Sequence, residues 1–138
     1  MNEEFDRLFA AATAARANAY VPYSHYRVGA AILTDDGRIF AGANIENAAY
    51  PQGQCAEATA IGAMGTAGGR RIAAVVVIGG EDGDGDVCTP CGGCRQRLRE
   101  FARPETAIHL CGPEGLRRTM TMEELLPASF GPHNLGRD

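Results

Sequence analysis

Residues 72–78 read Ile-Ala-Ala-Val-Val-Val-Ile and contain no polar side chain. A short, continuous run of this kind, rich in β-branched residues, is typical of a strand covered on both faces. Residues 91–101 follow with apolar residues at helical spacing, and residues 106–111 form another short apolar run that predicts a second buried strand. A strand, a helix and a strand in this order favour a sheet with helices packed against it.

The segments on either side extend this pattern. Asp36-Gly37 is a tight-turn pair between two extended segments and predicts a β-hairpin. Thr121 and Glu124 have the spacing of a capping box, which predicts a short final helix. We expect helices over 5–15, 55–67, 91–101 and 122–126, strands over 28–34, 38–44, 72–78 and 106–111, and loops over 44–54 and 81–89.

This order of elements predicts an α/β protein with a mixed sheet covered by helices on both faces. Neither an internal repeat nor a linker interrupts the chain, so we expect a single domain over residues 1–138.

Two residue counts narrow the chemistry. The 138 residues include five cysteines and no lysine, so that all 13 basic residues are arginines. The missing lysine excludes a P-loop phosphate site, a pyridoxal Schiff base and a lysine nucleophile. An odd number of cysteines without a signal peptide argues against a disulfide scaffold. We expect reduced thiols in a cytoplasmic protein, where they point to metal binding or catalysis.

Charge and hydropathy limit the expected partners. The net charge is −4, and the arginines are scattered among acidic residues. Nucleic acid is therefore not an expected partner, because binding it usually requires a basic surface. No stretch approaches the roughly 18 apolar residues that span a membrane, so no membrane partner is expected either. A small neutral substrate fits this composition better.

The pentapeptide Pro90-Cys91-Gly92-Gly93-Cys94 opens one of the predicted helices. Two cysteines at this spacing present both sulfurs to one point near the positive end of the helix dipole. That position lowers the pKa of a thiol and favours the thiolate, which binds metals or attacks disulfides. By itself the motif fits a redox dithiol or half of a structural zinc site about as well as a catalytic centre.

Cys55-Ala56-Glu57, at the start of another predicted helix, adds a third thiol and a carboxyl group. Three protein ligands on zinc leave the fourth tetrahedral position to water, as in catalytic sites. Glu57 would then lie beside that water and could accept its proton without binding the metal. Alone, Glu57 is more simply a solvated acid at a helix start; with Cys91 and Cys94 it indicates a catalytic zinc site.

A ligand-x-Glu segment followed by Pro-Cys-x-x-Cys is the pattern of zinc nucleobase deaminases. Over nearly its whole length the chain resembles the small, homotetrameric, zinc-dependent cytidine deaminases. With cysteine at position 55, the chain resembles the branch of the family that acts on free nucleosides. A histidine at this position would instead resemble the deoxycytidylate, transfer-RNA and polynucleotide deaminases. The matching segments are residues 22–31, 44–50, 55–57, 90–96 and 125–132.

The resemblance implies a three-layer α/β/α fold with about five strands and one zinc ion per subunit, held by Cys55, Cys91 and Cys94. Zinc-bound hydroxide would attack C4 of cytidine or 2′-deoxycytidine. Glu57 would carry protons from the water to N3 and to the departing ammonia. The resemblance places this reaction in pyrimidine salvage.

The resemblance also implies substrate contacts. Asn44 and Glu46 match the pair that hydrogen-bonds the ribose hydroxyls, and their i, i+2 spacing places both side chains on one face. The backbone around Ala56 would contact the base, and Tyr26 matches an aromatic residue that stacks on it. Phe130 resembles an aromatic residue that reaches into the active site of a neighbouring subunit in a tetramer.

Two positions depart from the family pattern. Tyr26 stands where many members have phenylalanine, so that its hydroxyl needs a partner. Ala58 stands where many members carry an arginine that donates to the zinc thiolates. Three thiolates on Zn²⁺ carry a net charge of −1, so we expect partial compensation from the two helix N-termini and from another arginine nearby.

Three alternatives remain open at this point. A deaminase of a related nucleoside such as blasticidin S would share the three cysteines, although residues 44–47 favour an enzyme that recognises ribose. A structural zinc module would use Cys88 or Cys111 as a fourth ligand, whereas we expect both to be small apolar fillers. A thioredoxin-like dithiol leaves the segment around Cys55 without a role.

Overall fold

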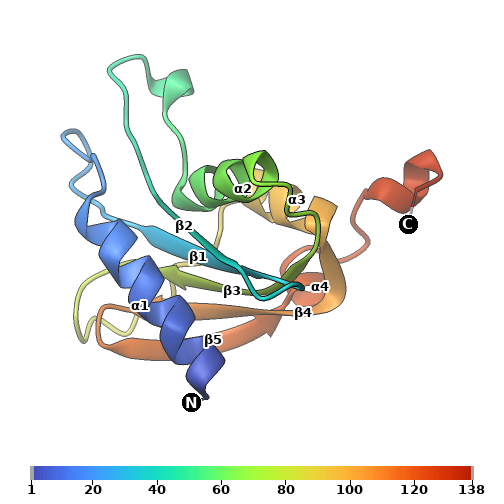
Figure 1. The fold of residues 1–138 in the computed structure, drawn as a ribbon. Coiled ribbons are helices and arrows are strands. Elements are labelled where there is room, and N and C mark those ends of the chain that lie inside the picture. Colours follow the sequence, from blue (N-terminus) through green and yellow to red (C-terminus); the bar gives the residue numbers. More distant parts are fainter. Residues whose placement is uncertain (1, 138) are drawn as a thin grey trace.

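A computed structural model describes residues 2–137 as a five-stranded sheet with helices on both faces (Figure 1). The strand order is β2-β1-β3-β4-β5, in which β3 and β4 are parallel and the other neighbours are antiparallel. The elements are α1 (Glu3–Ala17), β1 (Gly29–Thr34), β2 (Ile39–Ala43), η1 (Tyr50–Gln52), α2 (Ala56–Thr66), β3 (Ile72–Ile78), α3 (Gly92–Phe101), β4 (Ala102–Gly112), β5 (Gly115–Thr121), α4 (Met122–Leu125) and η2 (Pro132–Leu135).

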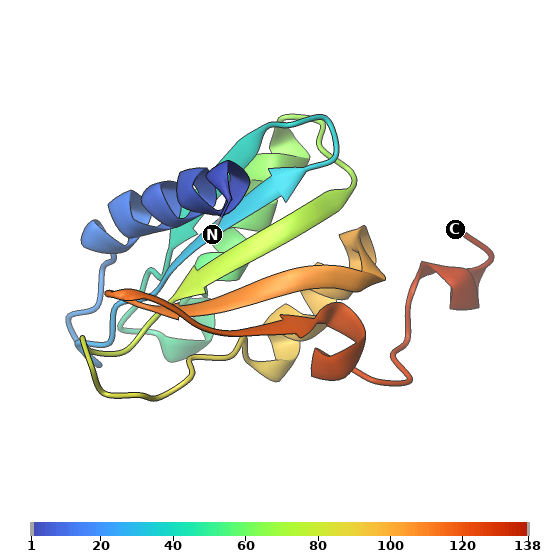
Figure 2. The ribbon, with the colours of Figure 1, turned by 90° about the horizontal axis from the view of Figure 1, so that it is seen from below.

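Alternate residues of the central strands face opposite helix layers. In β1, Ala31 and Leu33 pack against α1, whereas Ala30 and Ile32 pack in the core shared by α2, α3 and α4. Figure 2 shows α1 on one side of the sheet and the other long helices behind it. The three-layer α/β/α fold with a mixed sheet is therefore confirmed.

β3 has the bounds predicted from the continuous apolar run, Ile72–Ile78. Val75 and Val77 belong to the core beneath α2 and α3, and Val76 and Ile78 belong to the core beneath α1. All four side chains are at most 1% exposed. The absence of alternation in the sequence thus reflects burial on both faces.

The strand after β4 is the main difference from the sequence-derived elements. β5 reads Gly-Leu-Arg-Arg-Thr-Met-Thr and lies at the edge of the sheet, where every residue is partly or fully exposed. Such a strand has no apolar run and is held by its pairing with β4. β4 is also longer than predicted, because its first residues continue from α3 into an exposed extended segment.

Two features of the sequence position α2, α3 and α4 on the face of the sheet opposite α1. A side chain on Gly42 of β2 would come within 2.6 Å of the Ala60 backbone nitrogen, so glycine lets α2 lie close to the sheet. Arg95 of α3 donates to the carbonyls of Pro90 and Leu125, at 2.7 and 2.8 Å. These bonds fix the loop before α3 and the end of α4 relative to each other.

The acidic loop between β3 and α3 is held by one arginine. The Arg117 guanidinium on β5 donates to Asp84 at 2.6 Å, to Glu114 at 2.9 Å and to the Glu81 carbonyl at 2.6 Å. Asp84 also accepts from the Glu81 backbone N–H at 2.7 Å. The loop that leads to Cys91 is therefore tied to the β4–β5 hairpin at its midpoint.

The C-terminal segment lies apart from the sheet in both views (Figures 1 and 2). Its contacts with α3 include a 2.8 Å bond from Gln96 to the Phe130 carbonyl and a 2.8 Å bond from Arg99 to the Ser129 hydroxyl. The side chains of Phe130 and Leu135 are 58% and 74% exposed. Within residues 2–137, no helix has the length and apolar character to cross a membrane.

His109 on β4 gives folding stability a predicted dependence on pH. Its ring meets that of Phe5 edge-on, with 5.3 Å between centroids, and its Nδ1 is 2.9 Å from the Thr119 hydroxyl. Burial lowers the pKa of His109 below its usual value, and the Glu4 carboxylate offsets part of that shift. The unfolded chain therefore binds this proton more readily than the folded chain does.

The stabilising contribution of neutral His109 is complete above about pH 6.5 and is lost as the pH falls towards the lower pKa of the folded protein. We expect the thermal unfolding midpoint to fall between about pH 7 and pH 5, and to fall less in His109→Gln. Calorimetry across that range measures both. An equal fall in the two proteins would contradict a role for His109.

Candidate metal and catalytic site

The candidate site lies where the N-termini of α2 and α3 meet. Cys55 is the N-cap residue of α2, and Cys91 is the N-cap residue of α3. Cys94 lies in the first turn of α3 and is fully buried. Two helix starts separated by more than 30 residues in the sequence thus bring their cysteines together, with the positive end of each helix dipole directed at the sulfurs.

The geometry of the three thiols fits a zinc ion. Their sulfur atoms all lie within 4.8 Å of one another, and the Sγ atoms of Cys55 and Cys91 are 3.8 Å apart. Tetrahedral zinc with Zn–S bonds of about 2.3 Å places two sulfurs about 3.8 Å apart. Among residues 2–137, these cysteines form the one group of three or more potential ligands that is compact enough to hold a metal. The donor set and its spacing therefore suit zinc.

The thiols have different environments. The Cys94 backbone N–H hydrogen-bonds the Cys91 sulfur and lowers the pKa of Cys91. Burial raises the pKa of Cys94, and the nearby Glu57 carboxylate raises it further. Burial also raises the pKa of Cys55. Three sulfurs packed this closely repel one another as thiolates, so the donor set as a whole favours a bound cation.

Glu57 lies in the first turn of α2 and is 4% exposed. It lines the same cavity as Cys55 and Cys91. Burial raises the pKa of this carboxyl, and its own backbone N–H and the charge of Arg97 oppose the shift. A carboxyl group with a raised pKa can both hold and release a proton near neutral pH.

The Arg97 side chain lies beside one of the three thiols. Its Nη1 lies 3.8 Å from the Cys94 sulfur, one turn further along α3. The half-buried Ala58 contributes no charge. The expected compensation by the two helix N-termini and another arginine thus has a structural counterpart that the sequence did not identify by residue.

A cavity of about 200 Å³ adjoins the thiols. It is lined by Tyr26, Val28, Asn44, Cys55, Ala56, Glu57, Cys88, Thr89 and Cys91. Complete pockets for small molecules measure roughly 300–1,000 Å³. The cavity within one chain is thus small for a complete binding site.

Tyr26 and Cys88 interact at the edge of this cavity. Burial and a hydrogen bond to the Cys88 thiol raise the pKa of Tyr26 to about 12. The extra hydroxyl of tyrosine therefore has a partner. We expected Cys88 to be only an apolar filler, and its contact with Tyr26 was missed because residues 26 and 88 are distant in sequence. The position of Cys88, three residues before Cys91, was the only signal available.

The Asn44 side chain, beside the thiols, hydrogen-bonds the backbone just before β1. Its Oδ1 accepts from the Val28 N–H at 2.9 Å, and its Nδ2 donates to the Tyr26 carbonyl at 2.8 Å. One lone pair on the oxygen and one N–H therefore stay free for another partner. The Asn44 side chain lines the cavity beside the thiols.

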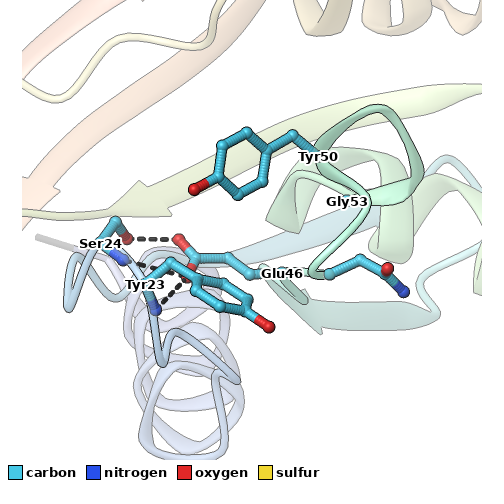
Figure 3. Close-up of a pocket in the computed structure, with 6 residues that line it drawn as sticks. Tyr23, Ser24, Glu46, Tyr50 and Gly53 are labelled. Carbon is cyan, nitrogen blue, oxygen red and sulfur yellow. Dashed lines mark hydrogen bonds between the residues drawn. The ribbon is translucent and has the colours of Figure 1, made fainter.

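Glu46 lines a second cavity of about 400 Å³ (Figure 3). Its carboxylate accepts from the backbone N–H groups of Tyr23 and Ser24, at 3.0 and 3.1 Å, and from the Ser24 hydroxyl. Figure 3 shows this carboxylate beside the rings of Tyr23 and Tyr50, which meet edge-on with 6.0 Å between their centroids. Asn44 lines the cavity beside the thiols, and Glu46 lines the cavity that also contains Tyr23 and Tyr50.

Ala56, Phe130 and Cys111 lie in three different places. Ala56 is 1% exposed and lines the cavity beside the thiols. Phe130 lies in the C-terminal segment, outside the residues that line either cavity. Cys111 is fully buried beneath α1, on the opposite face of the sheet from α2 and α3. Cys111 is therefore a packing residue, as expected.

The chain is similar to known proteins over most of its length. A family model for the zinc-binding region of cytidine and deoxycytidylate deaminases matches residues 2–110. The cytidine deaminase of Sporosarcina psychrophila is 40% identical over 132 residues, covering 96% of this chain and 95% of that protein. The cytidine deaminase of Mycobacterium tuberculosis (strain H37Rv) is 44% identical over 128 residues, covering 92% and 90%.

Solved structures show the same fold. The 1.6 Å crystal structure of cytidine deaminase from Burkholderia pseudomallei matches with a TM-score of 0.82 and 40% identity, covering 94% of this chain and 100% of that one. The crystal structure of cytidine deaminase from Mycobacterium leprae matches with a TM-score of 0.76 and 44% identity, covering 91% and 99%.

Proposed function

Because this chain belongs to the cytidine and deoxycytidylate deaminase family, we propose that it is a zinc-dependent hydrolase that deaminates cytidine and 2′-deoxycytidine. The observation that carries the proposal is a compact group of three cysteine sulfurs with the buried Glu57 carboxyl lining the same cavity. Water and the nucleoside give the uracil nucleoside and ammonia, so that no redox cofactor or amine nucleophile is required.

Cys55, Cys91 and Cys94 would hold the zinc ion, with one coordination position left over. When bound, zinc supplies Lewis-acid chemistry that makes a water molecule acidic enough to be a nucleophile near neutral pH. The helix N-termini at Cys55 and Cys91 favour the thiolate form of these ligands. The site thus combines three anionic ligands with two helix dipoles that offset part of their charge.

Glu57 moves the protons. Its carboxylate accepts a proton from the attacking water and delivers it to N3 of the base. A second transfer brings a proton to the amino group at C4, which leaves as ammonia. Burial of Glu57 suits this role, because a raised pKa brings the carboxyl closer to the operating pH.

Asn44 and Glu46 would bind the ribose hydroxyls. Asn44 keeps one free donor and one free acceptor, and Glu46 accepts three hydrogen bonds of about four that a carboxylate can take. The internal bonds hold both side chains in place before the substrate binds. Such pre-organisation reduces the entropy lost on binding.

Tyr26 and the backbone around Ala56 would contact the base. The Tyr26 ring keeps the π-face that stacking requires, and its hydroxyl is already bonded to Cys88. Ala56 is small enough to let the base approach the start of α2.

We further propose a homotetramer in which Phe130 completes the active site of a neighbouring subunit. Phe130 and Tyr50 are 58% and 76% exposed, and the C-terminal segment extends away from its own sheet, so both rings are accessible to a second subunit. The small cavity of the single chain supports this arrangement. The cytoplasm is the proposed compartment, because thiolate ligands stay reduced there.

A substrate comparison tests the proposal. We expect the zinc-loaded wild-type protein to convert cytidine and 2′-deoxycytidine to the uracil nucleosides with one ammonia per turnover, and to act far more slowly on blasticidin S. Chromatography of the products with an ammonia assay measures all three. A preference for blasticidin S would show instead that the protein is a deaminase of a related nucleoside. Inactivity on every cytosine nucleoside would refute the proposal.

A further inference from the structure

The proposed zinc site has a charge that few groups nearby can balance. Three thiolates and Zn²⁺ sum to −1, and α2 and α3 contribute only the partial charges of their N-termini. Position 58, in the first turn of α2, holds alanine. A compensating cation must therefore come from elsewhere in the fold.

Arg97 has the geometry for this role. It lies one turn after Cys94 on α3, and its Nη1 is 3.8 Å from the Cys94 sulfur. Among residues 2–137, this sulfur is the hydrogen-bond partner of the Arg97 side chain. A Cβ atom at Gly93 would lie 3.2 Å from the same Nη1, so the absence of a side chain there leaves room for the guanidinium.

The other arginines of α3 are occupied elsewhere. Arg95 donates to the carbonyls of Pro90 and Leu125. Arg99 donates to Ser129 and contacts His133 in the C-terminal segment. Arg97 is thus the member of the three whose guanidinium is directed at a thiol, and its charge also reaches Glu57.

We propose that Arg97 is a positioning residue that holds the Cys94 thiolate and balances the charge of the loaded zinc site. The proposal rests on the zinc site of the proposed function. It adds that Arg97 balances the charge of that site, since the alanine at position 58 has no charge to do so. A guanidinium that donates to the Cys94 sulfur holds this ligand in place, and its charge offsets the net charge of −1 on the loaded site. A cation beside Cys94 therefore favours the loaded state over the empty one.

The test compares zinc retention in Arg97→Gln, Arg97→Lys and wild type. Groups that hydrogen-bond a metal's ligands typically contribute 10–100-fold to metal affinity. Because Arg97 is exposed, we expect the low end: Arg97→Gln loses zinc to a chelator about 10-fold faster than wild type. Arg97→Lys keeps the charge without the planar fork and should recover part of this loss. A chromogenic chelator measures the released zinc directly.

The matched control is Arg7→Gln, which removes an exposed arginine from α1. It should release zinc at the wild-type rate. Thermal unfolding of the metal-free proteins should give the same midpoint for wild type and Arg97→Gln, which shows that the change acts on the loaded site and not on the fold.

Zinc release from Arg97→Gln at the wild-type rate would overturn the proposal, and so would release from Arg97→Lys as fast as from Arg97→Gln. If Arg7→Gln released zinc as fast as Arg97→Gln, the proposal would also be overturned, because the release rate would then depend on net charge alone. These outcomes differ from failure of the proposed function, in which wild type itself would bind no zinc or leave cytidine unchanged.

Discussion

Glu57→Ala is expected to keep its fold and its zinc and to deaminate cytidine at least about 10²–10⁴-fold more slowly than wild type. The carboxyl is 4% exposed and lines the cavity beside the thiols, but it is not one of the three clustered metal ligands. Its removal therefore takes away the group that moves protons and leaves the sulfur ligands in place. Steady-state rates and zinc content, both measured on the same preparation, give the result.

Glu57→Gln is the companion variant, because it keeps the volume of the side chain and the packing of α2. We expect the same loss of activity, since an amide cannot accept and release the proton. A loss in Glu57→Ala without a loss in Glu57→Gln would point to a packing effect instead. Near-normal activity in both variants would refute the proton-transfer role and the proposed mechanism with it.

Cys94→Ser is expected to bind zinc so weakly that purified protein contains almost none, and to have no measurable deaminase activity. Cys94 is fully buried in the first turn of α3, and its sulfur is one of three within 4.8 Å. Removing a direct ligand should cost more than the 10–100-fold typical of groups that only hydrogen-bond a ligand. Metal analysis after dialysis measures the zinc content.

Cys88→Ser and Cys111→Ser are the matched controls. Cys111 lies on the opposite face of the sheet, and Cys88 is outside the compact group of sulfurs, so both variants should keep zinc. A structural zinc module with four sulfur ligands predicts the reverse for one of them and a harmless Glu57→Ala. Zinc loss from either control would therefore favour the structural module over the catalytic site.

The candidate zinc ligands could be found in the sequence because their relations are local. Cys91 and Cys94 are related by one helical turn, and Cys55 and Glu57 by two residues at a helix start, so spacing alone indicates a shared chemistry. The burial of Ile72–Ile78 could be predicted for the same reason, because a strand covered on both faces reads as a continuous apolar run.

Other features depend on residues that no local pattern connects. β5 was not predicted, because an exposed edge strand is held by its neighbour and not by an apolar run. The contact of Tyr26 with Cys88 joins segments 62 residues apart (88 minus 26). The side chains of Asn44 and Glu46 are held by hydrogen bonds with residues 16 to 23 positions earlier in the chain, a relation that no local pattern shows.

The sequence by itself determined the ligand types, the helix starts that carry them and the buried central strand, since each follows from the spacing of a few neighbouring residues. Only the tertiary structure decided that Cys55 meets Cys91, with 3.8 Å between their sulfurs, and that the Arg97 guanidinium lies 3.8 Å from the Cys94 sulfur. The physical reason is that hydrogen bonds and charge interactions depend on distance in space, which the order of strands in the sheet sets and the distance along the chain does not.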